Sequence, residues 1–287
     1  MKIQNQTPIA ILLATYNGEL YLPEQLESIL SQTCQDFTIY IQDDGSSDNT
    51  QSIINEYVNK HSNIVSINNG LTRQGASLNF MNLLNCVDSE YYMFADQDDV
   101  WLPFKIETSV NRMHKVESEL GGAKSVPIII HTDRTYTDDK LNITRQSEFN
   151  HSGKCKDVVA KIEALKNHNI ISIYTTVGGC TMLINRFAKE ISFPYINIRM
   201  HDATIAMSVS AHKDGIISTI YESTMLYRQH SSNTCGVNTE SRLSKFKKLH
   251  KVISNNMMGF YIWKVYGRGS FFKFLYYRIK YYFIYYS

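Results

Sequence analysis

Residues 92–101, YMFADQDDVW, end an apolar run in a cluster of acidic side chains. The apolar residues Tyr91–Ala95 predict a buried strand. Residues two apart in an extended segment point to the same side, so Asp96 and Asp98 are expected to face one ligand, with Asp99 at the flank. Carboxylates this close repel each other unless a cation lies between them. The stretch therefore indicates a divalent cation, Mg²⁺ or Mn²⁺, that bridges the protein to a phosphorylated ligand.

The acidic stretch also has a simpler interpretation. It is typical of a surface loop in which Asp99 caps a helix that begins near Pro103. An EF-hand is excluded, because the sixth position of such a loop needs glycine and this chain has Trp101 there. Other parts of the chain must therefore decide between a cation site and a loop.

Three earlier apolar runs also end in polar clusters: Ile9–Ala14, Thr38–Ile41 and Ile64–Ile67. Amphipathic stretches with helical spacing separate them. This alternation predicts an α/β fold with a mostly parallel sheet, right-handed crossovers and helices on both faces. Such sheets bind ligands outside the carboxyl ends of their strands, so we expect the polar clusters to share one edge.

The polar residues at the strand ends suit a nucleotide. A hydroxyl, an aromatic face and an amide follow the first strand, and a cation follows the third. Two carboxylates follow the second strand and suit the N–H groups of a pyrimidine or the hydroxyls of a ribose. Each residue alone is typical of a solvated loop, but their convergence favours a binding site. The candidates are Thr15, Tyr16 and Asn17, then Asp43 and Asp44, then Arg73.

The composition suits a globular protein. The chain has 287 residues, of which 43% are hydrophobic, enough for one large domain or two small ones. Its five cysteines lie far apart, without CxxC spacing and without a secretory signal, so neither disulfides nor a structural zinc site is expected. A reducing cytosol is the expected compartment. No predominantly apolar run reaches the roughly 20 residues that span a bilayer, so a membrane-spanning protein is not expected.

Charge divides the chain near residue 240. Ten Lys or Arg and no Asp or Glu follow Glu240, so residues 241–287 carry +10 within a chain of net charge +2. Fourteen of the last 28 residues are aromatic. We therefore expect one acidic domain over residues 1–240, with halves 1–100 and 101–240, and a basic aromatic helical tail over 241–287.

The strand-end clusters and three later segments form a series of motifs. They are ATYNG (14–18), QDDGSSDNT (42–50), NNGLTRQGASLNF (68–80), ADQDDVW (95–101), GGCTMLINR (178–186), MHDATIA (200–206) and YRQHSSNT (227–234). In this order they resemble the family 2 glycosyltransferases of the GT-A fold, particularly bacterial rhamnosyltransferase-like members. The resemblance covers about residues 8–236.

The resemblance implies inverting transfer of a sugar from a UDP- or dTDP-linked donor to a hydroxyl of a glycan or lipid-linked acceptor. It makes 1–100 the nucleotide-binding half and 101–240 the acceptor half. Mn²⁺ or Mg²⁺ is the implied cofactor, held by Asp98 and His230, and Asp202 is the implied catalytic base. The implied nucleotide-sugar site contains Thr15, Tyr16, Asn17, Asp43, Asp44, Arg73, Asp96, Asp99 and Gly179.

The position of Asp202 agrees with this chemistry. Inversion needs a base on the face of the anomeric carbon opposite the leaving diphosphate, so the base must come from a segment distant from the metal site. The alternative is that Asp202 only caps a helix before Ala203–Val209. Ala203 and Thr204 replace an aromatic pair found in many relatives, which implies a roomier acceptor pocket.

The tail suits the surface of an anionic membrane, where each Lys or Arg contributes about 1 kcal/mol. We therefore expect a cytoplasmic protein that is peripheral on the inner face of the cell membrane. Packing of the tail on the domain or on a second subunit is the alternative, and no nucleic-acid partner is expected.

Two other functions compete with sugar transfer. A phosphatase of the haloacid-dehalogenase type also places DxD after a parallel strand, but that strand normally comes first in its domain. A non-catalytic nucleotide-binding module is the other candidate.

Overall fold

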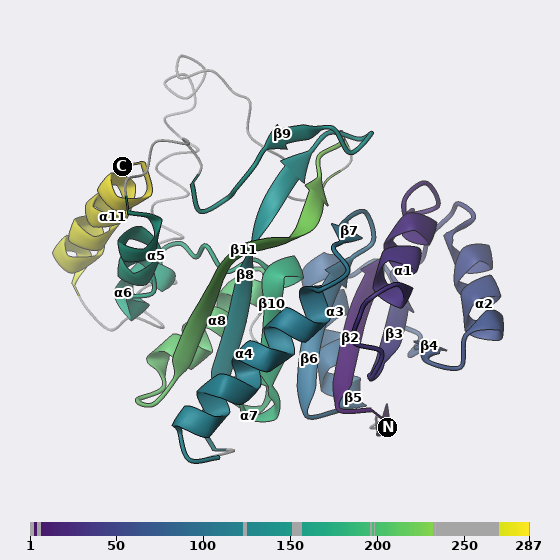
Figure 1. The fold of residues 1–287 in the computed structure, drawn as a ribbon, viewed down its shortest axis with the longest axis horizontal. Coiled ribbons are helices and arrows are strands. Elements are labelled where there is room, and N and C mark those ends of the chain that lie inside the picture. The colour runs from purple at the N-terminus through teal and green to yellow at the C-terminus, as the bar shows by residue number, and fades with distance from the viewer. Residues whose placement is uncertain are drawn as a thin grey trace.

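The computed structural model describes residues 3–4, 7–122, 125–150, 157–195, 197, 199–231, 233 and 270–286. A single large sheet with helices on both faces dominates the structure (Figure 1). The strands are β1 (Ile3–Gln4), β2 (Ile9–Thr15), β3 (Phe37–Asp43), β4 (Ile64–Ser66), β5 (Val87–Asp88), β6 (Tyr91–Asp96), β7 (Val100–Trp101), β8 (Ile128–Thr137), β9 (Ile143–Arg145), β10 (Met182–Asn185) and β11 (Ile216–Arg228). The helices are α1 (Leu22–Leu30), α2 (Thr50–Lys60), α3 (Ala76–Cys86), α4 (Lys105–Glu119), α5 (Val158–Leu165), α6 (His168–Ile171), the 3₁₀ turn η1 (Gly179–Thr181), α7 (Arg186–Ile191), α8 (His201–Ala211) and α11 (Phe271–Tyr286).

The large sheet has the strand order β4-β3-β2-β6-β10-β8-β11-β7, and β9 pairs with β8. The predicted strands of the first hundred residues are parallel to one another, so β2, β3, β4 and β6 end at the same edge. β10 lies antiparallel between β6 and β8, and β8 pairs in parallel with the long strand β11. Strands β2 to β4 and β6 to β11 therefore form one continuous sheet.

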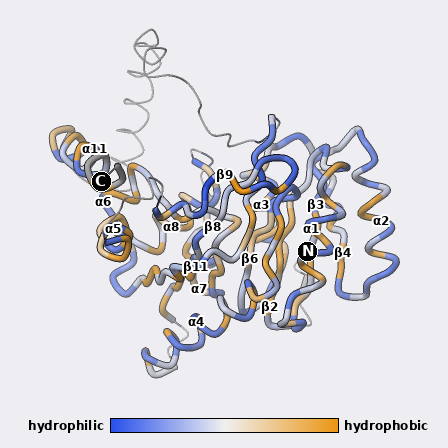
Figure 2. Tube along the Cα trace, turned by 45° about the horizontal axis from the view of Figure 1, so that its top comes forward, coloured by the Kyte–Doolittle hydropathy of each residue, from blue (hydrophilic) through white to orange (hydrophobic). Residues whose placement is uncertain are grey.

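Two hydrophobic cores lie on opposite faces of this sheet. Ile11 packs with Leu26 of α1 and Ile106 of α4, whereas its neighbour Leu12 packs with Phe80 of α3. This alternation follows from the strand geometry, in which successive side chains point to opposite faces. Figure 2 shows hydrophobic residues gathered along the central strands β2 and β6, with hydrophilic residues on the outer loops.

The C-terminal helix α11 packs against α5 and α6 at the end of the molecule opposite β3 and β4 (Figure 1). Phe274 is 1% exposed, and Tyr277, Tyr281 and Ile284 pack against a small core around Ile162. One face of the described tail thus packs on the domain, as the alternative interpretation of the tail expected. The predicted tail residues 241–269 lie outside the described residues.

Candidate active site

A cavity of about 1320 Å³ lies at the carboxyl ends of β2 and β6. Eight of the predicted site residues line it: Thr15, Tyr16, Asp44, Arg73, Asp96, Asp98, Gly179 and Asp202. Four others are not among the lining residues, but each is next in sequence or hydrogen-bonded to a residue that is: Asn17, Asp43, Asp99 and His230. Segments nearly 190 residues apart therefore meet at one site. The sheet-edge argument predicts this for the strand-end clusters, and the family resemblance implies it for Gly179 and Asp202.

Two carboxylates at the end of β3 organise the loops at one end of the cavity. Asp43 accepts the hydroxyl of Thr15 at 2.9 Å, which joins the ends of β3 and β2. Asp44 accepts the backbone N–H groups of residues 74–75 at 2.9 and 2.8 Å. These bonds hold the loop in which Arg73 adopts a left-handed backbone with φ of 58°. Both carboxylates thus organise loops that carry lining residues.

Three carboxylates crowd the end of β6. Burial and the negative charges of Asp98 and Asp202 raise the pKa of Asp96 to about 7. Asp99 is 0% exposed, and burial together with its acidic neighbours raises its pKa well above the usual range. Its Oδ1 accepts the backbone N–H of Arg228 at 3.2 Å, while its Oδ2 has no hydrogen-bond partner among the described residues. A cation at this cluster would relieve the repulsion.

Two groups of ligand atoms are available to such a cation. His230 Nε2 lies 2.8 Å from Asp98 Oδ2, and the two side chains are only 11% and 14% exposed. Asp96, Asp99 and Cys180 form a second group, with ligand atoms within 4.8 Å of one another. Burial raises the pKa of the Cys180 thiol, so it stays protonated, and soft sulfur is a poor ligand for hard cations. The Asp98 carboxylate at the cavity wall and the His230 imidazole beside it therefore fit Mn²⁺ or Mg²⁺ better, and the imidazole favours Mn²⁺.

Asp202 is held rigidly at the cavity wall. It lies in the first turn of α8, whose N-cap residue is Met200, and its carboxylate binds a backbone N–H of that turn, so it also serves the helix N-terminus as the helix-capping alternative describes. Its Oδ2 accepts the backbone N–H of Gly179 at 3.1 Å, and its Oδ1 accepts that of Ala203 at 2.6 Å. Two backbone donors thus fix the carboxylate while it faces the cavity.

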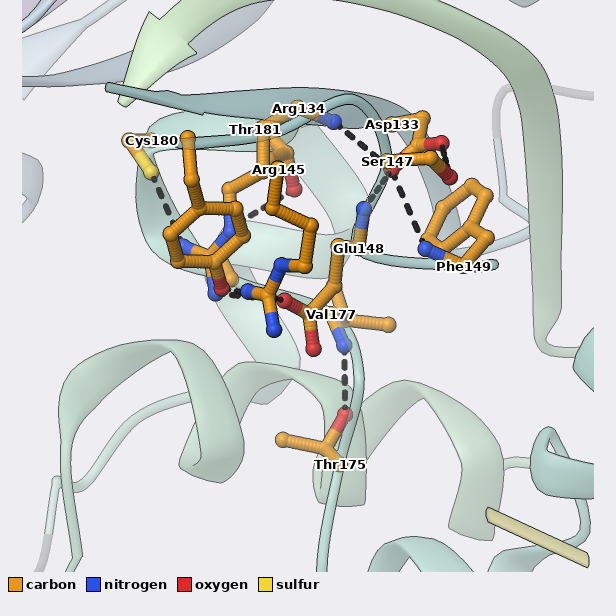
Figure 3. A network of polar contacts seen from close by, with 12 residues as sticks. Asp133, Arg134, Arg145, Ser147, Glu148, Phe149, Thr175, Val177, Cys180 and Thr181 are labelled. Carbon is orange, nitrogen blue, oxygen red and sulfur yellow. Dashed lines mark hydrogen bonds and ion pairs between the residues drawn. The ribbon is translucent and has the colours of Figure 1, made fainter. Parts of the chain in front are cut away.

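A basic wall that sequence analysis missed also lines the cavity (Figure 3). Arg145 pairs with Glu148 at 2.8 Å, and Arg134 lies 4.0 Å from the same carboxylate. Aromatic rings support both guanidinium groups, with Arg145 3.5 Å from the ring centroid of Tyr136 and Arg134 4.3 Å from that of Tyr227. Two cations against one carboxylate leave this wall positive, which suits negatively charged groups of a ligand.

Local hydrogen bonds explain how the basic wall forms. Asp133 accepts the backbone N–H groups of residues 148–149 at 2.9 and 3.2 Å, so the segment after β9 folds back onto β8 (Figure 3). The apolar residues at the start of β8 are followed by polar ones up to Thr137, and Arg134 lies in this polar part of the strand. Its position after the apolar part of a strand is the same signal that identified the other candidates.

The far end of the cavity is aromatic. Tyr174, just after α6, and Tyr281 of α11 both line it, with ring centroids 4.7 Å apart. Sequence analysis placed neither residue in the site. The C-terminal helix is therefore part of the cavity wall.

Among the described residues, no helix combines the length and the apolar character needed to cross a membrane.

Parallel strands that end at a cavity, with an acidic cluster and a separate carboxylate on its wall, fit the GT-A glycosyltransferase class that the motifs resemble. The model of the family "Glycosyl transferase family 2" matches residues 10–153. The chain belongs to this family and is a glycosyltransferase that uses a nucleotide-sugar donor.

Named relatives agree with the family. The dTDP-rhamnosyl transferase RfbG of Shigella flexneri is 28% identical over 252 residues, covering 83% of this chain and 78% of the relative. The Escherichia coli UDP-Glc:alpha-D-GlcNAc-diphosphoundecaprenol beta-1,3-glucosyltransferase WfaP is 26% identical over 221 residues, which cover 74% of this chain and 76% of the relative.

Solved structures share the fold. Residues 1–349 of TarS from S. aureus, in complex with UDP-GlcNAc, match with a TM-score of 0.58 and 18% identity over 90% of this chain and 67% of that one. The mannosyltransferase PcManGT of Pyrobaculum calidifontis, in complex with GDP-Man and Mn²⁺, matches with a TM-score of 0.55 and 12% identity. The match covers 94% of this chain and 78% of PcManGT.

Proposed function

We propose that this protein is an inverting glycosyltransferase that moves a sugar from a UDP- or dTDP-linked donor to a hydroxyl of a cell-surface polysaccharide or lipid-linked glycan. The observation that carries the proposal is the cavity lined by both Asp98 and Asp202, which come from segments 104 residues apart. One segment serves the diphosphate and the other the incoming hydroxyl. Rhamnose is the proposed sugar, because the relative named a dTDP-rhamnosyl transferase aligns over 83% of this chain.

In the proposed reaction, Asp202 takes the proton of the acceptor hydroxyl as its oxygen bonds to the anomeric carbon. The bond from that carbon to the diphosphate oxygen breaks, and the nucleotide diphosphate leaves. The backbone donors from Gly179 and Ala203 keep the carboxylate in one orientation for this transfer. Asp98 and His230 would hold Mn²⁺ or Mg²⁺, which would stabilise the charge on the departing diphosphate.

The test of the proposed base is Asp202→Asn. Wild type incubated with dTDP-rhamnose or UDP-glucose, Mn²⁺ and a glycan acceptor should release the nucleotide diphosphate. The variant should lose about 10²–10⁴-fold in transfer rate, the usual contribution of a positioned base. It should keep the rise in melting temperature that the donor produces. Asp214→Asn is the matched control, because Asp214 has a 55% exposed side chain and is not among the residues that line the cavity.

A normal transfer rate in Asp202→Asn would remove this residue as the base. The rival functions give different results. Loss of phosphate from simple phosphomonoesters without nucleotide diphosphate release would favour a phosphatase. Nucleotide affinity without turnover of any acceptor by wild type would favour a binding module.

We also propose that α11 brings the enzyme to an anionic membrane. The helix has a second apolar stripe at helical spacing, opposite the packed one, in which Phe272 is 81% exposed and Tyr276 59% exposed. The exposed residues Lys273 and Lys280 flank this stripe, and the helix contains no Asp or Glu. An apolar stripe bordered by cations is the pattern of an interfacial helix, and each cation contributes about 1 kcal/mol near anionic lipid.

Vesicle sedimentation tests the membrane contact. The double variant Phe272→Ser/Tyr276→Ser should lose binding to vesicles that contain phosphatidylglycerol, while Leu20→Ser, which removes another exposed apolar side chain, should not. Wild type should bind pure phosphatidylcholine vesicles much more weakly. Equal binding of the double variant and the control to the anionic vesicles would refute the proposed contact.

A further inference from the structure

The cavity wall contains a buried histidine without a hydrogen bond. His201 is 3% exposed and lines the cavity, yet neither of its ring nitrogens has a hydrogen-bond partner among the described residues. Most buried polar groups in proteins are paired, because an unpaired one loses its hydration without compensation. A group of this kind at a binding cavity points to a partner that arrives with the ligand.

The surroundings of His201 hold its ring in one place. Its centroid lies 4.4 Å from that of Phe80 and 5.3 Å from that of Phe94. On another side it packs against Gly179, where an added Cβ atom would stand 2.5 Å from Nε2. Burial lowers the pKa of His201 despite the nearby charge of Asp202, so the ring is neutral at pH 7. A neutral imidazole offers one donor and one acceptor, the pair of functions that a sugar hydroxyl matches.

The position of the His201 ring relative to the carboxylates indicates which part of the ligand would lie beside it. Phe94, against which His201 packs, is two residues before Asp96, and Asp202 is the next residue in the chain. Asp96 and Asp202 are close enough to affect each other electrostatically. In the proposed reaction the donor's anomeric carbon lies between the diphosphate and the base. The space beside His201 is therefore the space of the donor sugar.

We propose that His201 binds the donor sugar by a hydrogen bond between a ring nitrogen and a sugar hydroxyl. This inference rests on the proposed function and extends it to a residue that selects the sugar. A buried group that must pair with a hydroxyl discriminates strongly against sugars that lack it, because it is then left unpaired.

The test is His201→Phe, which keeps an aromatic ring between the two phenylalanines and removes both nitrogens. Melting temperatures are measured with Mn²⁺ plus dTDP or UDP, and with Mn²⁺ plus dTDP-rhamnose or UDP-glucose. Wild type should gain stability from the sugar beyond that from the nucleotide diphosphate. The variant should keep the rise in melting temperature that the nucleotide diphosphate produces and lose the further rise that the sugar adds. Its kcat/KM for the donor should fall by about tenfold or more.

Two further variants separate binding from packing. His131→Phe is the matched control: His131 is also fully buried but is not among the lining residues, so its change should leave the sugar part intact. His201→Gln restores an amide donor and acceptor and should recover part of the sugar contribution. Recovery in this variant remains informative if His201→Phe does not fold.

An unchanged sugar contribution in His201→Phe would overturn the inference. So would a ligand-free melting temperature that falls, together with equal losses of the nucleotide and sugar contributions, because that result describes a packing residue. These outcomes differ from failure of the proposed function, in which wild type itself would show no nucleotide-dependent stabilisation and no transfer.

Discussion

Gly179→Ala should damage both stability and catalysis, because the site has no room for one methyl group. The added Cβ would lie 2.5 Å from Nε2 of His201 and 3.0 Å from its Cε1, well inside contact distance. The ring cannot retreat, since Phe80 and Phe94 pack against it and are 1% and 0% exposed. Overpacking of this kind costs about 1–3 kcal/mol, or about 3–9 °C in melting temperature for a chain of this size.

The catalytic effect follows from the hydrogen bond of the same residue. The N–H of Gly179 holds Asp202 at 3.1 Å, so any shift of the backbone displaces the proposed base. A displacement near 1 Å costs on the order of 10²-fold in rate. Transfer kinetics and thermal unfolding of the purified variant measure the two effects.

The neighbouring glycine supplies the control. At Gly178 an added Cβ would lie 3.2 Å from Nη1 of Arg134, the end of a flexible side chain, so Gly178→Ala should cost less stability. In the double variant Gly179→Ala/His201→Ala the clash is gone, so the loss of stability should be smaller than the sum of the two single losses. Equal stability losses for the two glycine variants, or additive losses in the double variant, would refute the clash.

Three further measurements test other parts of the site. Asp98→Ala should abolish Mn²⁺-dependent nucleotide binding, measured by calorimetry with and without the ion, and unchanged affinity would remove the metal role. If the aromatic end of the cavity binds the acceptor, Tyr281→Ala should raise the KM for the acceptor and leave the donor-induced rise in melting temperature unchanged. Loss of that donor-induced rise would contradict an acceptor role for Tyr281. Burial lowers the pKa of His131 to about 3, against an unfolded value near 6.5, so the unfolded chain binds the extra proton between these values and stability falls as pH falls through that window. His131→Phe should therefore reduce the loss of unfolding free energy between pH 7 and pH 5 by about 2 kcal/mol, and an unchanged pH dependence would refute this.

The strands and the acidic site were predictable because their signals are local. The apolar run Ile9–Ala14 and the polar residues after it predict a strand with a functional end, and the structure has β2 there. The DxD spacing predicts that Asp96 and Asp98 share a ligand, and both line the cavity. The parallel arrangement of β2, β3, β4 and β6 follows from the helices between them.

The rest of the site depends on contacts that leave no local pattern. β10 is only four residues long, and its antiparallel place between β6 and β8 is set by long-range pairing. Arg134 lies beside Glu148 at the cavity wall because Asp133 ties down a segment 15 residues later. His201 stands out only once the structure shows that its ring is buried beside Gly179 without a hydrogen bond.

Under the proposed membrane contact, the C-terminal helix α11 would lie between the cavity and the membrane surface. Tyr281 on its packed face lines the cavity, while Tyr276 on its outer face would lie against lipid under the proposed membrane contact. Five residues of α-helix rise about 7.5 Å, and the helix with its side chains is about 10 Å wide. The aromatic end of the cavity would therefore stand about one helix diameter from the headgroups. A lipid-linked glycan would then approach the cavity from the membrane side, at the end lined by Tyr174 and Tyr281. Under the two proposals, the acceptor would bind at the end of the cavity beside the membrane, which would give the basic aromatic helix a role that the acidic domain could not fill.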